Sequence, residues 1–181
     1  LINLARDGYL WFLERGTGPI RFVEGKPFVT QTVFRSLDPV TGRPDVDPAR
    51  KPGTGKRADF CPGPHGGKNW PPIAFSPQTR MIYIPANSGL CGIHRGVPVK
   101  YQKGRSFAGS QSGGQFTAPG VNHIGEVQAW NVDTGQKVWT HPYPTSPTWG
   151  SVLATAGGVV FTGGSKDRKN HAFVPWGGKG L

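Results

Sequence analysis

The sequence predicts an all-β fold, on three observations. The 181 residues include 28 Gly and 18 Pro, about a quarter of the chain, together with six Trp, ten Phe and four Tyr. No amphipathic helix of useful length can be found. A short turn motif recurs between apolar runs. These features are typical of many short strands joined by tight turns, and we expect one domain spanning residues 1–181.

The recurring turn pairs a carboxylate or amide side chain with Thr-Gly three residues later, as in Asn131, Thr134 and Gly135. In such a turn the Asx side chain accepts hydrogen bonds from backbone N–H groups, and the glycine takes a positive φ. Three stretches share the pattern: AWNVDTGQKVW (129–139), SLDPVTGRP (36–44) and FLERGTGPI (12–20). Two more match less closely: AFSPQTRMIYI (74–84, with Arg80 at the glycine position) and AFVPWGGKG (172–180, with Val174 and Gly177 at the Asp and Thr positions).

Strand-like runs flank these turns, and they are GYLWFL (8–13), MIYIPA (81–86), GEVQAW (125–130), QKVWTH (136–141) and GGVVFTGG (157–164). A repeated strand–turn–strand unit is the signature of a β-propeller. A β-sandwich with similar turns is the alternative. The copies at Glu14 and Asp38 are closer than one propeller blade, so either they serve different hairpins or loops interrupt the period.

Charge is unevenly distributed in this chain, whose formal net charge is +11. No acidic residue occurs in 61–125, which carries Lys68, Arg80, Arg95, Lys100, Lys103 and Arg105. This is either a basic face for an acidic partner or a solvated surface. The cations are scattered and no nucleic-acid motif accompanies them, so a nucleic-acid partner is not expected. No run of 18 apolar residues predicts a membrane span.

The Ser/Gly-rich stretch around VPVKYQKGRSFAGSQSGG predicts a loop insertion over residues 96–122. We expect Lys100, Lys103 and Arg105 to be exposed on it. It would either cover a site or meet an acidic partner.

The two cysteines, Cys61 and Cys91, both lie next to Gly or Pro, as expected for rigid turns. No CxxC motif or nearby His pair completes a metal site, so a disulfide is favoured. It would stabilise the fold by about 3–4 kcal/mol in the loop-entropy account. A disulfide also indicates an oxidising compartment.

The segment CPGPHGGKNW (61–70) is too rich in Pro and Gly for a helix and is a poor strand. It therefore holds Asn69 and Trp70 at the end of a fixed irregular loop. His65 lies within it, and His123 lies in a second Gly-rich loop. We expect both histidines to be surface residues rather than catalytic bases.

Four segments together carry a family resemblance. Ala129–Trp139 resembles the tryptophan-docking motif of quinoprotein dehydrogenases. ARDGYLWFLERGTG, CPGPHGGKNWPPIAFSPQTRMIYIPA and SPTWGSVLATAGGVVFTGG resemble three further segments of that family, in family order. The chain is identified as similar to the PQQ-dependent alcohol dehydrogenases, methanol and ethanol dehydrogenase group. That family also has a bridge matching Cys61–Cys91.

The resemblance implies part of an eight-bladed β-propeller, with about four blades present. The expected fragment lacks the N-terminal part and the closing blade. From about Val174 onward the sequence departs from the family pattern, which leaves the fold of residues 174–181 open.

The resemblance also implies a site for pyrroloquinoline quinone (PQQ). Arg6 matches the catalytic, cofactor-binding arginine, whose guanidinium stabilises charge on the quinone. Asn69 matches an asparagine at the same edge, Trp149 a tryptophan at the carboxylate side, and Trp70 is a further contact. The catalytic Asp and the ligands of a Ca²⁺ or lanthanide ion are expected upstream, outside this chain.

The implied function is a section of a periplasmic enzyme that oxidises an alcohol by hydride transfer to PQQ and passes electrons to a cytochrome c. The expected partners are the alcohol, the cytochrome c and the remainder of the propeller, with a homodimer left open; the fragment alone is expected to be inactive. One alternative is a non-catalytic propeller module of the outer-membrane assembly type, which would lack Arg6, Asn69 and Trp149. Another is a PQQ dehydrogenase for polymeric or bulky alcohols.

Overall fold

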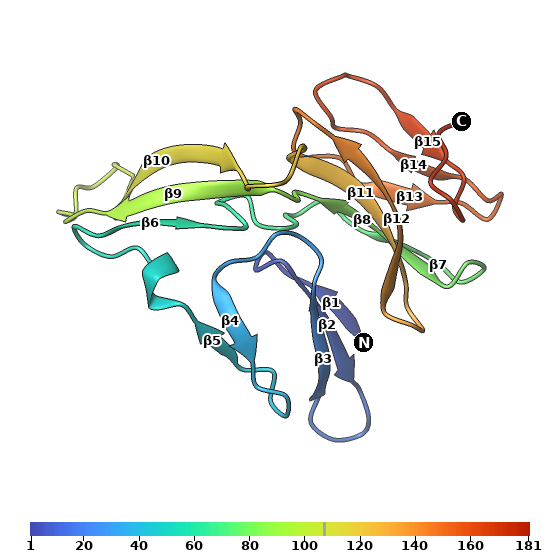
Figure 1. The fold of residues 1–181 in the computed structure, drawn as a ribbon, viewed down its shortest axis with the longest axis horizontal. Helices are drawn as coiled ribbons and strands as arrows, with labels where there is room; N and C mark the ends of the chain where they lie inside the picture. Colours follow the sequence, from blue (N-terminus) through green and yellow to red (C-terminus); the bar gives the residue numbers. More distant parts are fainter. Residues whose placement is uncertain (107) are drawn as a thin grey trace.

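The computed structural model describes residues 1–106 and 108–181, and this part of the chain is all β apart from one short 3-10 helix (Figure 1). All ladders between its strands are antiparallel. The elements are β1 (Ile2–Leu4), β2 (Tyr9–Glu14), β3 (Arg21–Pro27), β4 (Phe34–Leu37), β5 (Pro44–Val46), η1 (Pro48–Arg50), β6 (Arg57–Phe60), β7 (Ala74–Ser76), β8 (Met81–Ala86), β9 (Leu90–Gly96), β10 (Ser110–Thr117), β11 (Gly125–Asn131), β12 (Gln136–Tyr143), β13 (Val152–Ala154), β14 (Val160–Thr162) and β15 (His171–Phe173).

A four-stranded sheet of order β12-β11-β8-β7 forms the centre of the structure. All six residues of β8 are buried, as are the first six of β11. Side chains of a strand alternate between the two faces of its sheet. Ile82 and Ile84 therefore face one neighbour, and Met81 and Tyr83 face the other. Both faces of this sheet are thus covered by protein.

The sheet β1-β2-β3 covers one face of the central sheet. Leu10 and Phe28 pack with Ile82, Ile84 and Trp130 in one apolar cluster. The sheet β13-β14-β15 covers the opposite face (Figure 1).

Trp139 of β12 joins the central sheet to the β13-β14-β15 sheet. Its ring centroid lies 5.9 Å from that of Tyr83 and 5.7 Å from that of Phe173. Its indole Nε1 donates to the Pro175 carbonyl oxygen at 2.6 Å. One tryptophan thus contributes apolar contact and a hydrogen bond to the same interface.

A fourth sheet, of order β10-β9-β6, extends away from the centre, and β4 and β5 form a separate hairpin (Figure 1). The predicted disulfide is confirmed: Cys61, just after β6, is bonded to Cys91 in β9. Both cysteines are buried and pack with Ala118. No helix in the described residues is long and apolar enough to cross a membrane.

The stretch 96–122, expected as a loop insertion, is partly a strand. Ser110–Thr117 forms β10 and pairs with β9, with a register shift between Ser112 and Gly114. Residue 107 in this stretch lies outside the described residues. The Ser and Gly residues that predicted a loop lie in a strand that is exposed along most of its length, where no apolar alternation reveals it.

The recurring turn forms in four of its five predicted copies. The residue at the glycine position has a left-handed backbone in all four, with φ of 70° at Gly42, 55° at Arg80, 62° at Gly135 and 63° at Gly178. Gly18, in the copy at 12–20, does not have a positive φ. The three-residue spacing alone therefore did not ensure this turn.

The last copy shows that residues after Val174 continue the repeated geometry. The Gly178 N–H donates to the Val174 carbonyl oxygen at 2.9 Å, as Gly135 donates to Asn131 at 2.9 Å. The turn also lies against Trp139, since a Cβ added at Gly178 would come within 2.6 Å of its ring atoms. A glycine is thus required here by both the turn and the close approach.

We predict that Gly178→Ala lowers the free energy of unfolding by about 2–4 kcal/mol. The left-handed backbone accounts for about 1–2 kcal/mol and the contact with Trp139 for the rest. Gly18→Ala is the matched control, because Gly18 has an ordinary φ and no neighbouring atom within 4 Å of an added Cβ. Urea denaturation should show the control unchanged or up to about 1 kcal/mol more stable. Equal losses in the two variants would contradict this account of the turn.

Candidate functional site

The Gly/Pro-rich loop 61–70 connects β6 to β7 and is fixed at several points. The disulfide anchors its first residue, Cys61, to β9. The Gly63 N–H donates to the Leu90 carbonyl oxygen at 2.8 Å, and the Gly66 N–H donates to Gly63 at 2.8 Å. The loop therefore has a defined path despite having no regular secondary structure.

Arg6, in the turn between β1 and β2, lies directly on this loop. Its guanidinium Nη2 donates to the Pro64 carbonyl oxygen. Its own carbonyl oxygen accepts the Gly67 N–H at 3.0 Å. A Cβ added at Gly66 would lie 2.7 Å from the Arg6 Cβ and 2.9 Å from its Cα. Only a glycine allows the loop backbone to come this close to Arg6.

Asn69 closes the loop on itself. Its Nδ2 donates to the His65 carbonyl oxygen at 3.0 Å, and its Oδ1 accepts the Trp70 N–H at 2.8 Å. One of the two Nδ2 protons remains for another acceptor. The Trp70 side chain is 70% exposed.

His65 links the loop to Trp149. The ring centroids of His65 and Trp149 lie 4.8 Å apart in an edge-on arrangement. His65 is half-buried, and its Nδ1 is buried without a hydrogen-bond partner among the described residues. The prediction that His65 is a surface residue was therefore wrong, because the Gly-rich sequence around it gave no sign of the aromatic contact.

His123 was also wrongly predicted to be a surface residue. Its side chain is only 17% exposed, and its Nε2 lies 3.3 Å from Oε2 of the buried Glu126. This Nε2 has no hydrogen-bond partner among the described residues. The imidazole of His123 lies next to Glu126 of the central sheet. Within the described part of the chain, no hydrogen bond joins His123 to the 61–70 loop.

Burial shifts the pKa of the ionisable residues next to Arg6 and Asn69. Burial raises the pKa of Asp7, although hydrogen bonds from the Tyr9 N–H at 2.9 Å and the Trp11 indole at 3.1 Å oppose the shift. Burial lowers the pKa of Lys68, whose Nζ donates to the Asn69 carbonyl oxygen at 2.9 Å. The immediate surroundings of Arg6 and Asn69 are thus partly shielded from water.

The structure brings the predicted residues onto one loop and its contacts. Arg6 is bonded to the 61–70 loop and Asn69 belongs to it. Trp149, 80 residues after Asn69, contacts the loop through His65. Three side chains with N–H donors thus gather from segments that are distant in sequence. That all three line a single cavity stays a prediction.

Comparison with known proteins finds quinoprotein dehydrogenases among the relatives of this chain. No protein-family model matches the chain. It is 34% identical over 167 residues to the quinoprotein alcohol dehydrogenase PedH of Pseudomonas putida, covering 87% of this chain and 27% of that protein. It is 30% identical over 165 residues to the lanthanide-dependent methanol dehydrogenase of Methylacidiphilum fumariolicum, covering 90% of this chain and 26% of that protein.

A solved structure titled europium-containing methanol dehydrogenase matches with a TM-score of 0.87 and 28% sequence identity, over 99% of this chain and 31% of that chain. The chain thus spans about a quarter of the length of the curated relatives that it matches. The several antiparallel sheets seen here match one part of the methanol dehydrogenase propeller.

We predict that Gly66→Ala destabilises the fold by about 1–3 kcal/mol more than Gly55→Ala. Both glycines have a φ of 76°, so both variants bear the same left-handed cost of about 1–2 kcal/mol. Only the alanine at Gly66 would meet the backbone of Arg6, because nothing lies within 4 Å of an added Cβ at Gly55. Urea denaturation measures the difference. If the two variants are equally stable, the loop does not depend on close contact with Arg6.

Proposed function

Because the chain is homologous, over part of their length, to the PQQ-dependent alcohol and methanol dehydrogenases, we propose that it supplies one part of such an enzyme's cofactor site. The proposed fold context is an eight-bladed propeller, of which this chain forms about four blades. The observation that carries the proposal is the gathering of Arg6, Asn69 and Trp149 around the 61–70 loop.

The donor chemistry of these residues fits PQQ. Its carboxylates and quinone oxygens are hydrogen-bond acceptors, and when bound it supplies the redox chemistry by accepting a hydride from the alcohol. The Arg6 guanidinium keeps further N–H groups beyond the one bonded to Pro64. Asn69 keeps one Nδ2 proton, and the indole of Trp149, 37% exposed, has one N–H. A small set of convergent donors is what an acceptor-rich ring requires.

Arg6 would stabilise negative charge on the bound acceptor. A fixed cation close to the atom where charge develops lowers the free energy of that charged state. Arg6 is held for this role by the loop backbone, because both its guanidinium and its carbonyl oxygen are hydrogen-bonded to loop residues. Asn69 would bind the same edge, and Trp149 the carboxylate side, with Trp70 as a further contact.

Other parts of the reaction are proposed to lie outside this chain. The general base and the ligands of a Ca²⁺ or lanthanide ion are assigned to the remainder of the propeller. The whole enzyme would pass electrons to a cytochrome c in the periplasm. The Cys61–Cys91 disulfide supports an oxidising compartment.

We predict that Arg6→Gln in the full-length protein lowers kcat for alcohol oxidation by about 10²–10³-fold, the usual effect of removing one such donor. Arg15→Gln is the control, since Arg15 is likewise exposed but lies in the hairpin turn after β2. Dye-linked assays with saturating PQQ and metal ion measure kcat, and circular dichroism monitors the fold. Full activity in Arg6→Gln would refute the role given to Arg6.

The stretch 97–109 supports a second prediction, about the electron acceptor. Lys100, Lys103 and Arg105 are exposed there. Reversing all three to Glu should slow electron transfer to an acidic cytochrome c several-fold at low salt, because electrostatic steering accelerates such encounters. The same reversal at Lys166, Arg168 and Lys169 is a control of equal charge change. Similar rates and similar salt dependence in the two triple variants would mean that Lys100, Lys103 and Arg105 belong to an ordinary solvated surface.

A further inference from the structure

We infer that Asn87, which follows β8, positions Trp149 relative to Arg6 and Asn69, an inference that rests on the proposed function. Asn87 is 1% exposed, so it acts through other residues rather than by touching a ligand. It is bonded to the 61–70 loop, which carries Asn69 and contacts Arg6, and to Thr148, the residue before Trp149.

The first set of bonds joins Asn87 to the 61–70 loop. The Asn87 backbone N–H donates to the Gly67 carbonyl oxygen at 2.8 Å. Its side-chain Nδ2 donates to the Gly66 carbonyl oxygen at 3.4 Å. Gly67 in turn donates its N–H to the Arg6 carbonyl oxygen at 3.0 Å. The part of the loop that holds Arg6 and precedes Asn69 is therefore fixed to Asn87.

The second set of bonds joins Asn87 to the segment that precedes β13. Its Oδ1 accepts the Thr148 N–H at 2.9 Å and the Thr148 hydroxyl at 3.2 Å. The Thr148 hydroxyl also lies 3.1 Å from the Ala86 carbonyl oxygen. Thr148 is 3% exposed, and the next residue in the chain is Trp149.

Asn87 thus uses its N–H, its amide N–H and its amide oxygen to join the 61–70 loop, at Gly66 and Gly67, to Thr148. Each of these polar groups is buried, and leaving one unpaired costs about 1–3 kcal/mol. Because breaking these bonds is costly, they hold the backbone of the 61–70 loop at a fixed separation from the backbone of Thr148. A cofactor-binding arrangement requires placement to within about 0.5 Å. The Asn87 amide is the element that sets this placement for Trp149, because it bonds the residue before Trp149 and the loop that carries Asn69.

The test is a double-mutant cycle in the full-length protein, read out as the Kd for PQQ in a titration of the apoprotein. Asn87→Ala should raise the Kd by about 10–100-fold, the range found when residues that hold ligands in place are removed. In the Trp149→Phe background the same change should raise the Kd much less, because the contact that Asn87 positions is already altered. Unfolding free energies are measured for all variants.

Thr79→Ala is the matched control. Thr79 is also buried, and its hydroxyl is 2.9 Å from the Tyr83 hydroxyl, near the opposite end of β8 from Asn87. The control should lower stability and leave the Kd for PQQ unchanged. This outcome separates positioning from a general loss of stability.

If Asn87→Ala does not fold, Thr148→Val replaces it in the cycle, since it keeps the shape and the N–H bond and removes only the hydroxyl bonds. A wild-type protein that does not bind PQQ would overturn the proposed function and this inference with it. A wild-type protein that binds PQQ, with an unchanged Kd in the variant or an equal rise in both backgrounds, would overturn the role of Asn87 alone.

Discussion

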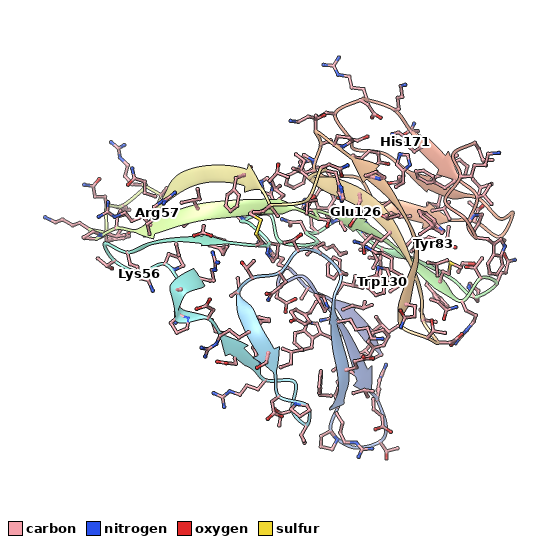
Figure 2. All side chains as sticks on the ribbon, in the orientation of Figure 1. Lys56, Arg57, Tyr83, Glu126, Trp130 and His171 are labelled. Atoms are coloured by element: carbon pink, nitrogen blue, oxygen red, sulfur yellow. A yellow bond between two sulfur atoms is a disulfide. The ribbon has the colours of Figure 1, made fainter. Side chains whose placement is uncertain are left out.

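The burial of both faces of the β12-β11-β8-β7 sheet is the constraint on which the rest of the structure depends. Polar residues inside such a sheet need partners within the protein. In β11, Gln128 donates to the Phe28 carbonyl oxygen at 2.6 Å and to Glu126 at 2.5 Å, and accepts the Trp130 indole N–H at 2.6 Å. This network joins the central sheet to Phe28, the residue that follows β3 (Figure 2 labels Glu126 and Trp130). The neighbouring sheets are thus joined by specific bonds as well as by apolar contact.

A sheet held in this way provides fixed ends from which loops can present side chains. The segment after β8 and the segment before β13 are bonded to each other at Asn87 and Thr148. The 61–70 loop is bonded to the same place and is closed at its other end by the disulfide. Irregular loops on a rigid scaffold are where binding residues commonly lie. The site therefore owes its order to the strands beneath it.

Local patterns predicted the regular parts of this fold well. MIYIPA coincides with β8, and the turns at Gly42, Arg80 and Gly135 have the expected left-handed residue, because strand burial and turn chemistry are encoded over a few residues. The positions of His65 and His123 were not predictable in this way. His65 depends on a contact with Trp149, which is distant in sequence, and no short-range pattern records such a contact. His123 lies close to Glu126 in sequence, but its burial depends on how the start of β11 enters the central sheet.

Short-range sequence patterns also failed to identify the candidate site and β10. Arg6, Asn69 and Trp149 were identified through a family resemblance, since composition and spacing alone would not distinguish them from a surface charge, a loop cap and a packing aromatic. Asn87 was missed because an Asn before Ser-Gly also fits an ordinary turn. β10 was missed because Ser and Gly residues occupy a strand that is largely exposed.

The turn at Arg80 is linked by an ion pair to the turn of the neighbouring hairpin. Arg80 is a non-glycine residue with φ 55°, which costs about 1–2 kcal/mol relative to glycine. Its guanidinium binds both carboxylate oxygens of Asp133, at 2.9 and 2.5 Å, in the turn of the adjacent hairpin. Both side chains are about half exposed, so this pair offsets only part of that cost. Replacing Asp133 would therefore leave Arg80 with the cost of its left-handed backbone and without the ion pair that offsets it, so the two neighbouring turns are coupled in stability.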